Sequence, residues 1–285
     1  MLLPSKASMN PAPLHFEKHI PVTDDQLTAV DILSDHTELP KNQIKQAMQK
    51  GAVWLTRQQH TQRLRRAKSR LRTGDQLHLY YDENILASEP APAIMIADEG
   101  SYSIWYKPYG VYCQGSKWGD HCTINRIAEK QLQRPCFIVH RLDRATTGLV
   151  IVAHKKKTTA ALATLFEQRR IEKHYQAIVE GKFPAAETIN TPVDDKPAVS
   201  HISILSSNEQ FSWVKIAIET GRKHQIRKHL SSIGFPIAGD RLYGNDQQHQ
   251  QDLQLCCYQL KFQCPVSSEE KHYLLKDSLQ LSLLD

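Results

Sequence analysis

A single carboxylate stands between two arginines in residues 140–144, which read His-Arg-Leu-Asp-Arg. Cationic neighbours favour the ionised form of a carboxyl group, which then only accepts hydrogen bonds. Asp143 is therefore suited to act as a nucleophile or a general base and poorly suited to donate a proton. The guanidinium groups of Arg141 and Arg144 suit a substrate that carries phosphate. Taken alone, the pattern also fits a salt-bridged loop aspartate without a chemical role.

Two other segments place an aromatic ring or a cation in a position to assist such a carboxylate. Residues 169–175 form a basic run that ends at Tyr175, and residues 220–230 carry Arg227 beside an apolar helical stripe. The stripe would anchor the helix while Arg227 points to a cleft. The alternatives are a strand aromatic at the core edge for Tyr175 and an ordinary surface arginine for Arg227.

The elements that must position these residues belong to a chain of 285 residues with 40% hydrophobic residues, enough for one large domain or two smaller ones. A net charge of +6 is compatible with nucleic acid without requiring it. The six cysteines have no disulfide-like spacing, the N-terminus has no apolar signal region, and no apolar run is long enough to span a membrane. We expect a cytoplasmic, monomeric protein without membrane contact.

Composition and periodicity divide the chain into four parts. Proline-rich residues 1–22 are expected to form an N-terminal arm, and residues 23–87 a small α/β module. Residues 88–93, which include Pro90 and Pro92, read as a linker. Residues 94–285 alternate strand patterns with short helical stripes. They predict an α+β domain whose central sheet is mixed but mainly antiparallel, with peripheral helices.

The module contains a run of seven Arg or Lys residues and no acid between residues 57 and 72. At residues 42–53 and 71–77 the module is similar to a small RNA-binding module of a ribosomal small-subunit protein that many RNA-modifying enzymes also carry. We favour RNA binding over a solvated helix face, because an uncompensated run of one charge repels itself. The candidate residues are Arg63, Arg65, Arg66 and Arg70.

Three motifs then follow in order: His-Arg-Leu-Asp at residues 140–143, Gly-Arg-Lys-His-Gln-Ile-Arg at 221–227, and Gly-Asp-Arg-Leu-Tyr-Gly at 239–244. At these residues, and at Tyr-Lys-Pro-Tyr-Gly from residue 106, the chain resembles the RluA-like pseudouridine synthases. The resemblance implies the pseudouridine synthase fold. It also implies an isomerase (an intramolecular transferase) that converts uridine in RNA to pseudouridine without a cofactor or a metal.

The resemblance assigns roles to the three residues of the opening argument. Asp143 attacks C1′ of the ribose or removes its 2′ proton. Tyr175 stacks on the uracil and offers a phenol near C5. Arg227 forms a charge-assisted pair with Asp143, since an unpaired buried charge is costly. His224 and His229 could suggest a metal pair, but no convincing third ligand accompanies them, and we predict no metal site.

Extrusion of a nucleotide also needs a group that fills the vacated stack, and by resemblance this is Arg141. Weaker candidates for backbone or structural contacts are Lys107, Arg144, Lys173, Arg222 and His224. The chain departs from the family pattern at residues 255–257, where Leu-Cys-Cys replaces the common Leu-His-Ala. We expect Cys256 and Cys257 to be buried strand residues rather than nucleophiles.

Other functions remain open at this point. A non-catalytic RNA-binding or ribosome-assembly factor could use the same fold. A glycosidic hydrolase would commonly need a second carboxylate, and none stands at a comparable position. Ribosomal RNA is favoured as the substrate because of the N-terminal module, which would make the protein an rRNA-processing enzyme, and transfer RNA is the alternative.

Overall fold

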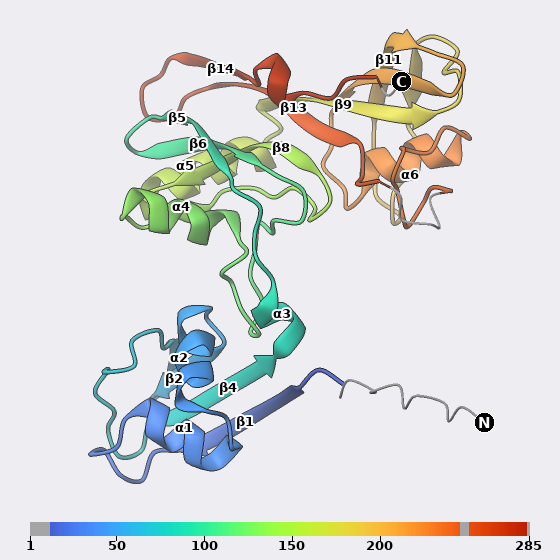
Figure 1. Ribbon diagram of the computed structural model, residues 1–285. Coiled ribbons are helices and arrows are strands. Elements are labelled where there is room, and N and C mark those ends of the chain that lie inside the picture. The colour runs from blue at the N-terminus through green and yellow to red at the C-terminus, as the bar shows by residue number, and fades with distance from the viewer. Residues whose placement is uncertain (1–11, 246–250, 284–285) are drawn as a thin grey trace, which may run out of the picture. The chain divides into compact units, whose positions relative to one another are not determined.

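The computed structural model describes residues 12–245 and 251–283. The chain forms two compact units, and each has its own hydrophobic core (Figure 1). The N-terminal unit comprises residues 1–89 together with residues 115–122, and the C-terminal unit comprises residues 90–114 and 123–285. Among the described residues, no helix combines the length and apolar character needed to cross a membrane.

The N-terminal unit packs two helices against an antiparallel sheet with the strand order β1-β4-β2-β3. Its elements are β1 His15–Pro21, α1 Ala29–Thr37, α2 Lys41–Gln49, β2 Val53–Arg57, β3 His60–Arg63, β4 Gln76–Asp82 and α3 Glu83–Ala87. A capping box between Thr28 and Asp31 begins α1. The apolar stripe of α2 faces the alternating apolar residues of β2 and β4, as their periodicity predicts.

The predicted arm at residues 1–22 needs correction. Residues 15–21 are strand β1, paired with β4 along its whole length. Ile20 is buried and Phe16 packs against the same core, so alternate side chains of this segment reach the interior despite Pro21. Residues 1–11 lie outside the described residues.

The C-terminal unit is built on a sheet of ten strands among the described residues, with a central order β10-β11-β12-β9-β13-β8-β6-β5. Its strands are β5 Ile94–Asp98, β6 Tyr102–Lys107, β7 Phe137–Ile138, β8 Thr147–Ala153, β9 Ile171–Glu180, β10 Glu187–Ile189, β11 Ser200–Ser207, β12 Phe211–Ile218, β13 Leu255–Gln263 and β14 Glu270–Leu274. Its helices are α4 Ile124–Leu132, α5 Lys156–Glu167, α6 Gln225–Ser232 and a 3-10 turn, Asp277–Leu279. In Figure 1, α4 and α5 lie beside the β6–β8 part of the sheet and α6 near β9.

The strand pairs of this sheet are antiparallel in the described part of the chain, apart from β13 with β8, which is parallel. This confirms the predicted α+β class with a mixed, mainly antiparallel sheet. The predicted division of the chain differs at one point. Residues 115–122 lie in the N-terminal unit, although they fall within the predicted domain 94–285. The chain otherwise changes units between Glu89 and Pro90, inside the predicted linker.

Candidate active site

A cavity of about 350 Å³ lies within the C-terminal unit, where the loop before β8 meets β9 and the start of α6. Asp143, Tyr175 and Arg227, which are far apart in sequence, all line it. Three residues predicted to contact RNA line it as well, namely Arg141, Arg222 and His224. The fold therefore brings together the groups that the sequence could only place in separate motifs.

A buried lysine stabilises the loop that carries Asp143. Lys107 is fully buried, and its Nζ donates to the carbonyl oxygens of Val111 (2.8 Å), Pro108 (3.1 Å) and Arg144 (3.2 Å). Burial lowers the pKa of Lys107 to about 8. Of the two roles predicted for Lys107, the structure shows the structural contact, and full burial of the side chain argues against contact with RNA.

The end of the same loop depends on a glycine. Gly148 pairs with Cys257 across the parallel β8–β13 contact and has φ +112°, a conformation that L side chains rarely adopt. A Cβ atom there would overlap the backbone of Cys257. Cys256 and Cys257 are completely buried in β13, as predicted, and burial raises the pKa of both thiols. Neither is therefore suited to act as a nucleophile.

Tyr175 presents an aromatic ring to the cavity but holds its phenol proton firmly. It points from β9 and is only 7% exposed. Burial, with the nearby thiol of Cys257, raises the pKa of the phenol well above its ordinary value. The group stays protonated at neutral pH. A phenolate at this position is therefore disfavoured as the base that removes a proton.

Arg227 has a different partner from the predicted one. Its Nε and Nη2 atoms donate to the two carboxylate oxygens of Asp240, at 2.8 and 2.6 Å. The expected charge-assisted pair between Arg227 and Asp143 was therefore wrong. Asp240 is better placed because its oxygen also accepts the backbone N–H groups of Leu242 and Tyr243, so it forms a rigid receptor for a guanidinium group.

The imidazole ring of His224 lies near the carboxylate of Asp143. Its Nε2 lies 3.7 Å from Oδ2 of Asp143, and its Nδ1 lies 2.9 Å from the hydroxyl of Tyr243. The guanidinium of Arg227 lies 5.1 Å from the centre of the same tyrosine ring. The sequence assigned no role to Asp240 or Tyr243. Their signal was present in the motif at residues 239–244, which was recognised as a pattern without an assigned chemical role.

Comparisons with known proteins agree with this geometry. Residues 101–232 match the family model for RNA pseudouridylate synthases, a span that contains Asp143, Tyr175 and Arg227. An uncharacterized RNA pseudouridine synthase of Chloroflexus aurantiacus is 38% identical over 39% of this chain and 40% of its own length. The ribosomal large subunit pseudouridine synthase D of Nitrosomonas europaea is 32% identical over 55% and 51% of the two chains.

Residues 101–232 thus resemble the RNA pseudouridylate synthase family. The chain spans between 40% and 66% of the lengths of three of its curated relatives, among them one from Bacillus subtilis that is 30% identical. A solved human structure, RNA pseudouridylate synthase domain containing 1, has the same fold, with a TM-score of 0.57, 21% identity and coverage of 67% of this chain and 86% of its own.

The other residues predicted to contact RNA differ in their exposure and in their partners within the protein. Arg141 and Arg144 are exposed, and the guanidinium of Arg144 lies 5.0 Å from the ring centre of Tyr112. Arg222 donates from Nε to the carbonyl of Pro197. Lys173 lies outside the cavity lining, over the ring of Phe166. Exposure leaves the guanidinium groups of Arg141 and Arg144 accessible to a partner.

His140 of the first motif has a structural environment. Its Nε2 accepts the backbone N–H of Ile151 at 3.0 Å, and its ring stacks on Phe166 with centres 4.2 Å apart. Burial lowers its pKa to about 3, so the ring is neutral and can accept this hydrogen bond at neutral pH. His140 thus connects the loop that carries Asp143 to β8 through this hydrogen bond.

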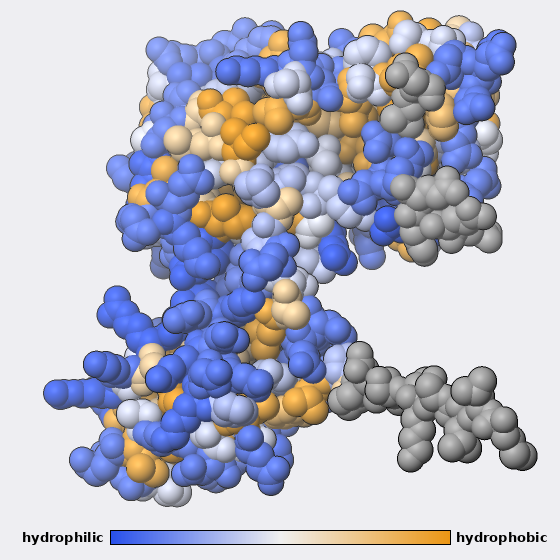
Figure 2. All heavy atoms as spheres, in the orientation of Figure 1, coloured by the Kyte–Doolittle hydropathy of each residue, from blue (hydrophilic) through white to orange (hydrophobic). Residues whose placement is uncertain are grey.

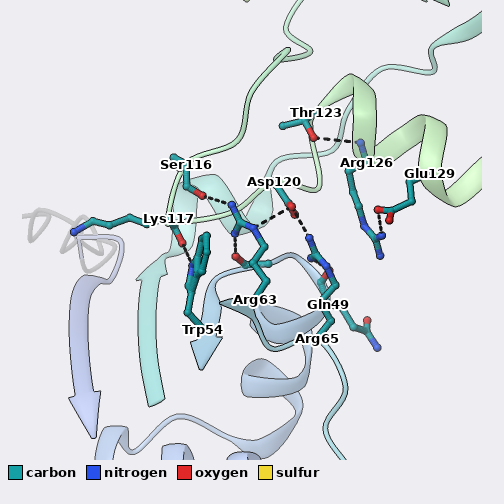
Figure 3. Close-up of polar contacts among 11 residues, drawn as sticks. Gln49, Trp54, Arg63, Arg65, Ser116, Lys117, Asp120, Thr123, Arg126 and Glu129 are labelled. Atoms are coloured by element: carbon teal, nitrogen blue, oxygen red, sulfur yellow. Dashed lines mark hydrogen bonds and ion pairs between the residues drawn. The ribbon is translucent and has the colours of Figure 1, made fainter. Parts of the chain in front are cut away.

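The basic run of the N-terminal unit is partly neutralised by the protein itself. Arg63 and Arg65 both form ion pairs with Asp120, which lies in the segment 115–122 (Figure 3). Arg57 pairs with Asp75. Asp75 follows the run closely and Asp120 comes from a distant segment, so the run is not the uncompensated patch that its composition suggested. The predicted RNA contacts by Arg63 and Arg65 are corrected accordingly.

Other cations of the same run remain available to a partner. Arg66, Lys68, Arg70 and Arg72 are exposed, and they follow β3 in an irregular segment rather than in a helix. Hydrophilic residues cover most of the visible face of the unit in Figure 2. Within the described residues, no cluster of three or more His, Cys, Asp or Glu side chains could hold a metal ion.

Proposed function

We propose that the protein isomerises uridine in RNA to pseudouridine, with Asp143 as the residue that acts on the ribose. The observation that carries this proposal is the convergence of Asp143, Tyr175 and Arg227 on one cavity of about 350 Å³. That volume lies within the usual range for small-molecule sites and is of the right order for one nucleotide unit. The match of residues 101–232 to the family model for RNA pseudouridylate synthases supports the same reaction.

The chemistry requires two bonds of the uridine to break and two new bonds to form. The N1–C1′ bond breaks, the uracil turns, C5 bonds to C1′, the C5 proton leaves and N1 takes up a proton. Asp143 has a side chain that is 27% exposed at the cavity, so a ribose can reach its carboxylate. It attacks C1′, in a bond that breaks again when C5 bonds to C1′, or it removes the 2′ proton and later returns it. Both routes need the ionised form.

Tyr175 and the arginines supply the binding that this reaction needs. The neutral phenol ring of Tyr175 offers a stacking face for the detached uracil, which must stay in place while it turns. Arg141 is exposed beside the cavity and carries a planar cation that can replace an extruded base in the RNA stack. Side chains of the protein itself fill both of these binding roles.

A substrate labelled with tritium at C5 of uridine tests the reaction directly, because pseudouridine formation releases that label. We expect Asp143→Asn to abolish tritium release while RNA affinity is kept. A matched control is Asp98→Asn, which removes a carboxylate that pairs with Arg134 outside the cavity. Tritium release by a folded Asp143→Asn protein at the wild-type rate would contradict the proposed mechanism.

We further propose that the RNA is ribosomal, since relatives from Nitrosomonas europaea and Pseudomonas aeruginosa are named for the ribosomal large subunit. Mapping of pseudouridine across all RNAs of a deletion strain tests this and identifies the position. A lost site in transfer RNA would replace the ribosomal proposal. An unchanged profile with defective ribosomal particles would favour a non-catalytic assembly factor.

The N-terminal unit is proposed to bind RNA through its exposed cations and not through Arg63 and Arg65. Neutralising Arg66 and Arg70 together should weaken RNA binding and reduce the slope of log K against log salt by about 1.4, at roughly 0.7 per lost contact to single strands. The matched control changes Lys156 and Lys157, two exposed cations at the start of α5. Equal slopes for wild type and the Arg66/Arg70 variant would exclude this surface.

A further inference from the structure

His224 occupies a position that its sequence motif does not explain. It immediately precedes α6 and has φ +55° and ψ +24°, a left-handed conformation that is uncommon for residues other than glycine. Gln225 stabilises this turn, because its Oε1 atom accepts hydrogen bonds from the N–H of Arg222 and the hydroxyl of Thr220. The surrounding structure thus fixes the imidazole of His224 in the cavity wall.

The two ring nitrogens of His224 face different groups. Nδ1 lies 2.9 Å from the hydroxyl of Tyr243, and Nε2 lies 3.7 Å from Oδ2 of Asp143. A neutral imidazole carries one proton, so one nitrogen donates and the other accepts. With the proton on Nδ1, the lone pair of Nε2 would face an ionised carboxylate. With the proton on Nε2, the Tyr243 hydroxyl donates to Nδ1 and the Nε2–H group faces Asp143.

We propose that Tyr243 fixes the Nε2–H tautomer of His224, and that this N–H group positions the carboxylate of Asp143 for its attack on the ribose. His224 is then a positioning residue and does not touch the reacting atoms. This inference rests on the proposed function. It replaces the sequence-based prediction that His224 contacts RNA.

The charges around His224 agree with a neutral donor. Its side chain is 14% exposed, and burial together with Arg227 and Lys223 lowers its pKa, against the opposing effect of Asp143 and Asp240. The distance of 3.7 Å is longer than a hydrogen bond, and contacts of this kind commonly tighten when the substrate enters. Asp240 fixes the guanidinium of Arg227, which lies over the ring of Tyr243.

A matched pair of substitutions tests whether His224 acts by donating a hydrogen bond from Nε2. In His224→Gln the side-chain amide nitrogen reaches about as far as Nε2, whereas in His224→Asn it reaches only as far as Nδ1. We expect His224→Asn to lower the single-turnover rate by about 10- to 100-fold, the usual effect of losing an orienting contact, with RNA affinity within about twofold of wild type. His224→Gln should recover most of the rate. Tyr243→Phe should lower it as well, because the tautomer is no longer fixed.

Two results would overturn the inference from these rates. Weaker RNA binding with an unchanged single-turnover rate would return His224 to the role of an RNA contact. Equal losses of rate in His224→Asn and His224→Gln, with equal losses of thermal stability, would make its role structural only.

The tautomer itself can be observed without any turnover. In protein labelled with ¹⁵N at histidine, the chemical shifts of the two ring nitrogens report which one carries the proton. We expect the Nε2–H form in the wild type and a mixture in Tyr243→Phe. An Nδ1–H form in the wild type would refute the inference even if the enzyme is active, and an inactive protein with the Nε2–H form would count against the proposed reaction alone.

Discussion

The ion pair between Arg227 and Asp240 offers a sharp test of the energetics of the site. Both side chains are almost fully buried, at 6% and 0% exposure, and two hydrogen bonds of 2.8 and 2.6 Å join them. Removing one partner of such a pair leaves a buried charge uncompensated, which costs about 3–5 kcal/mol. We therefore expect Asp240→Asn to lower the free energy of unfolding of the C-terminal unit substantially.

The geometry places the expected loss at the lower end of that range. Oδ1 of Asp240 accepts from Arg227 and from the backbone N–H groups of Leu242 and Tyr243, and an asparagine oxygen can keep these contacts. The asparagine NH₂ group would then face Nε–H of Arg227, so two donors meet where a carboxylate oxygen stood. A loss of about 3 kcal/mol follows, a large part of the stability of an ordinary domain.

The control for this variant removes the partner of Lys228, which lies beside Arg227 on α6. Lys228 pairs with Asp194 at 2.5 Å, but that carboxylate is 60% exposed. Such pairs contribute about 0–1 kcal/mol, so Asp194→Asn should have little effect. Urea unfolding followed by hydrogen exchange in peptides of β9 and β12 reports on this unit alone. If Asp240→Asn costs no more than Asp194→Asn, the guanidinium of Arg227 is compensated by another group, and the reasoning from burial fails.

Two other predictions concern the frame of the catalytic loop. Gly148→Ala should cost about 3 kcal/mol or more and abolish tritium release, because a Cβ atom would overlap the backbone of Cys257 at φ +112°; a melting temperature within a degree of wild type would contradict this. The pKa of Lys107 is about 8 in the folded protein and 10.5 ordinarily, because burial disfavours the charged form. Between these pH values the unfolded state binds more protons than the folded state. The free energy of unfolding should therefore rise from pH 8 to pH 10.5. The difference between the two pKa values corresponds to a rise of roughly 3 kcal/mol, at 1.36 kcal/mol for each pKa unit. Measurement of unfolding at a series of pH values should show no such rise for Lys107→Met.

Local patterns in the sequence were enough to predict much of the fold. The stripe of α2, the alternation of β4, β9 and β12 and the buried run of β8 are all present in the structure. These elements follow from apolar periodicity, which depends only on neighbouring residues. Strand β1 escaped prediction because its prolines and charges obscure the two side chains, Phe16 and Ile20, that reach the core.

The candidate site could be predicted as a set of residues but not as a set of contacts. Asp143, Tyr175 and Arg227 were named from their motifs, and the fold places all three on one cavity. Their pairing could not be derived in the same way. A guanidinium binds whichever carboxylate offers two oxygens in a fixed geometry, and this choice depends on the backbone around Asp240.

The basic run of the N-terminal unit shows the same limit. Composition alone predicted a chain of uncompensated cations, because no acid lies within residues 57–72. The structure supplies Asp75 and Asp120 from outside the run, and Asp120 comes from a segment that follows β6. Charges on a folded chain are balanced in space and not along the sequence.

By itself, the sequence determined the class of the fold and named three residues that line the cavity, since residue types, spacing and periodicity are local properties. Only the tertiary structure decided what each charged group does. It buried Lys107 beneath the loop of Asp143, gave Arg227 to Asp240 and turned His224 towards Asp143. The physical reason is that the energy of a charge depends on its burial and on the partners within a few ångströms, which the fold alone assembles.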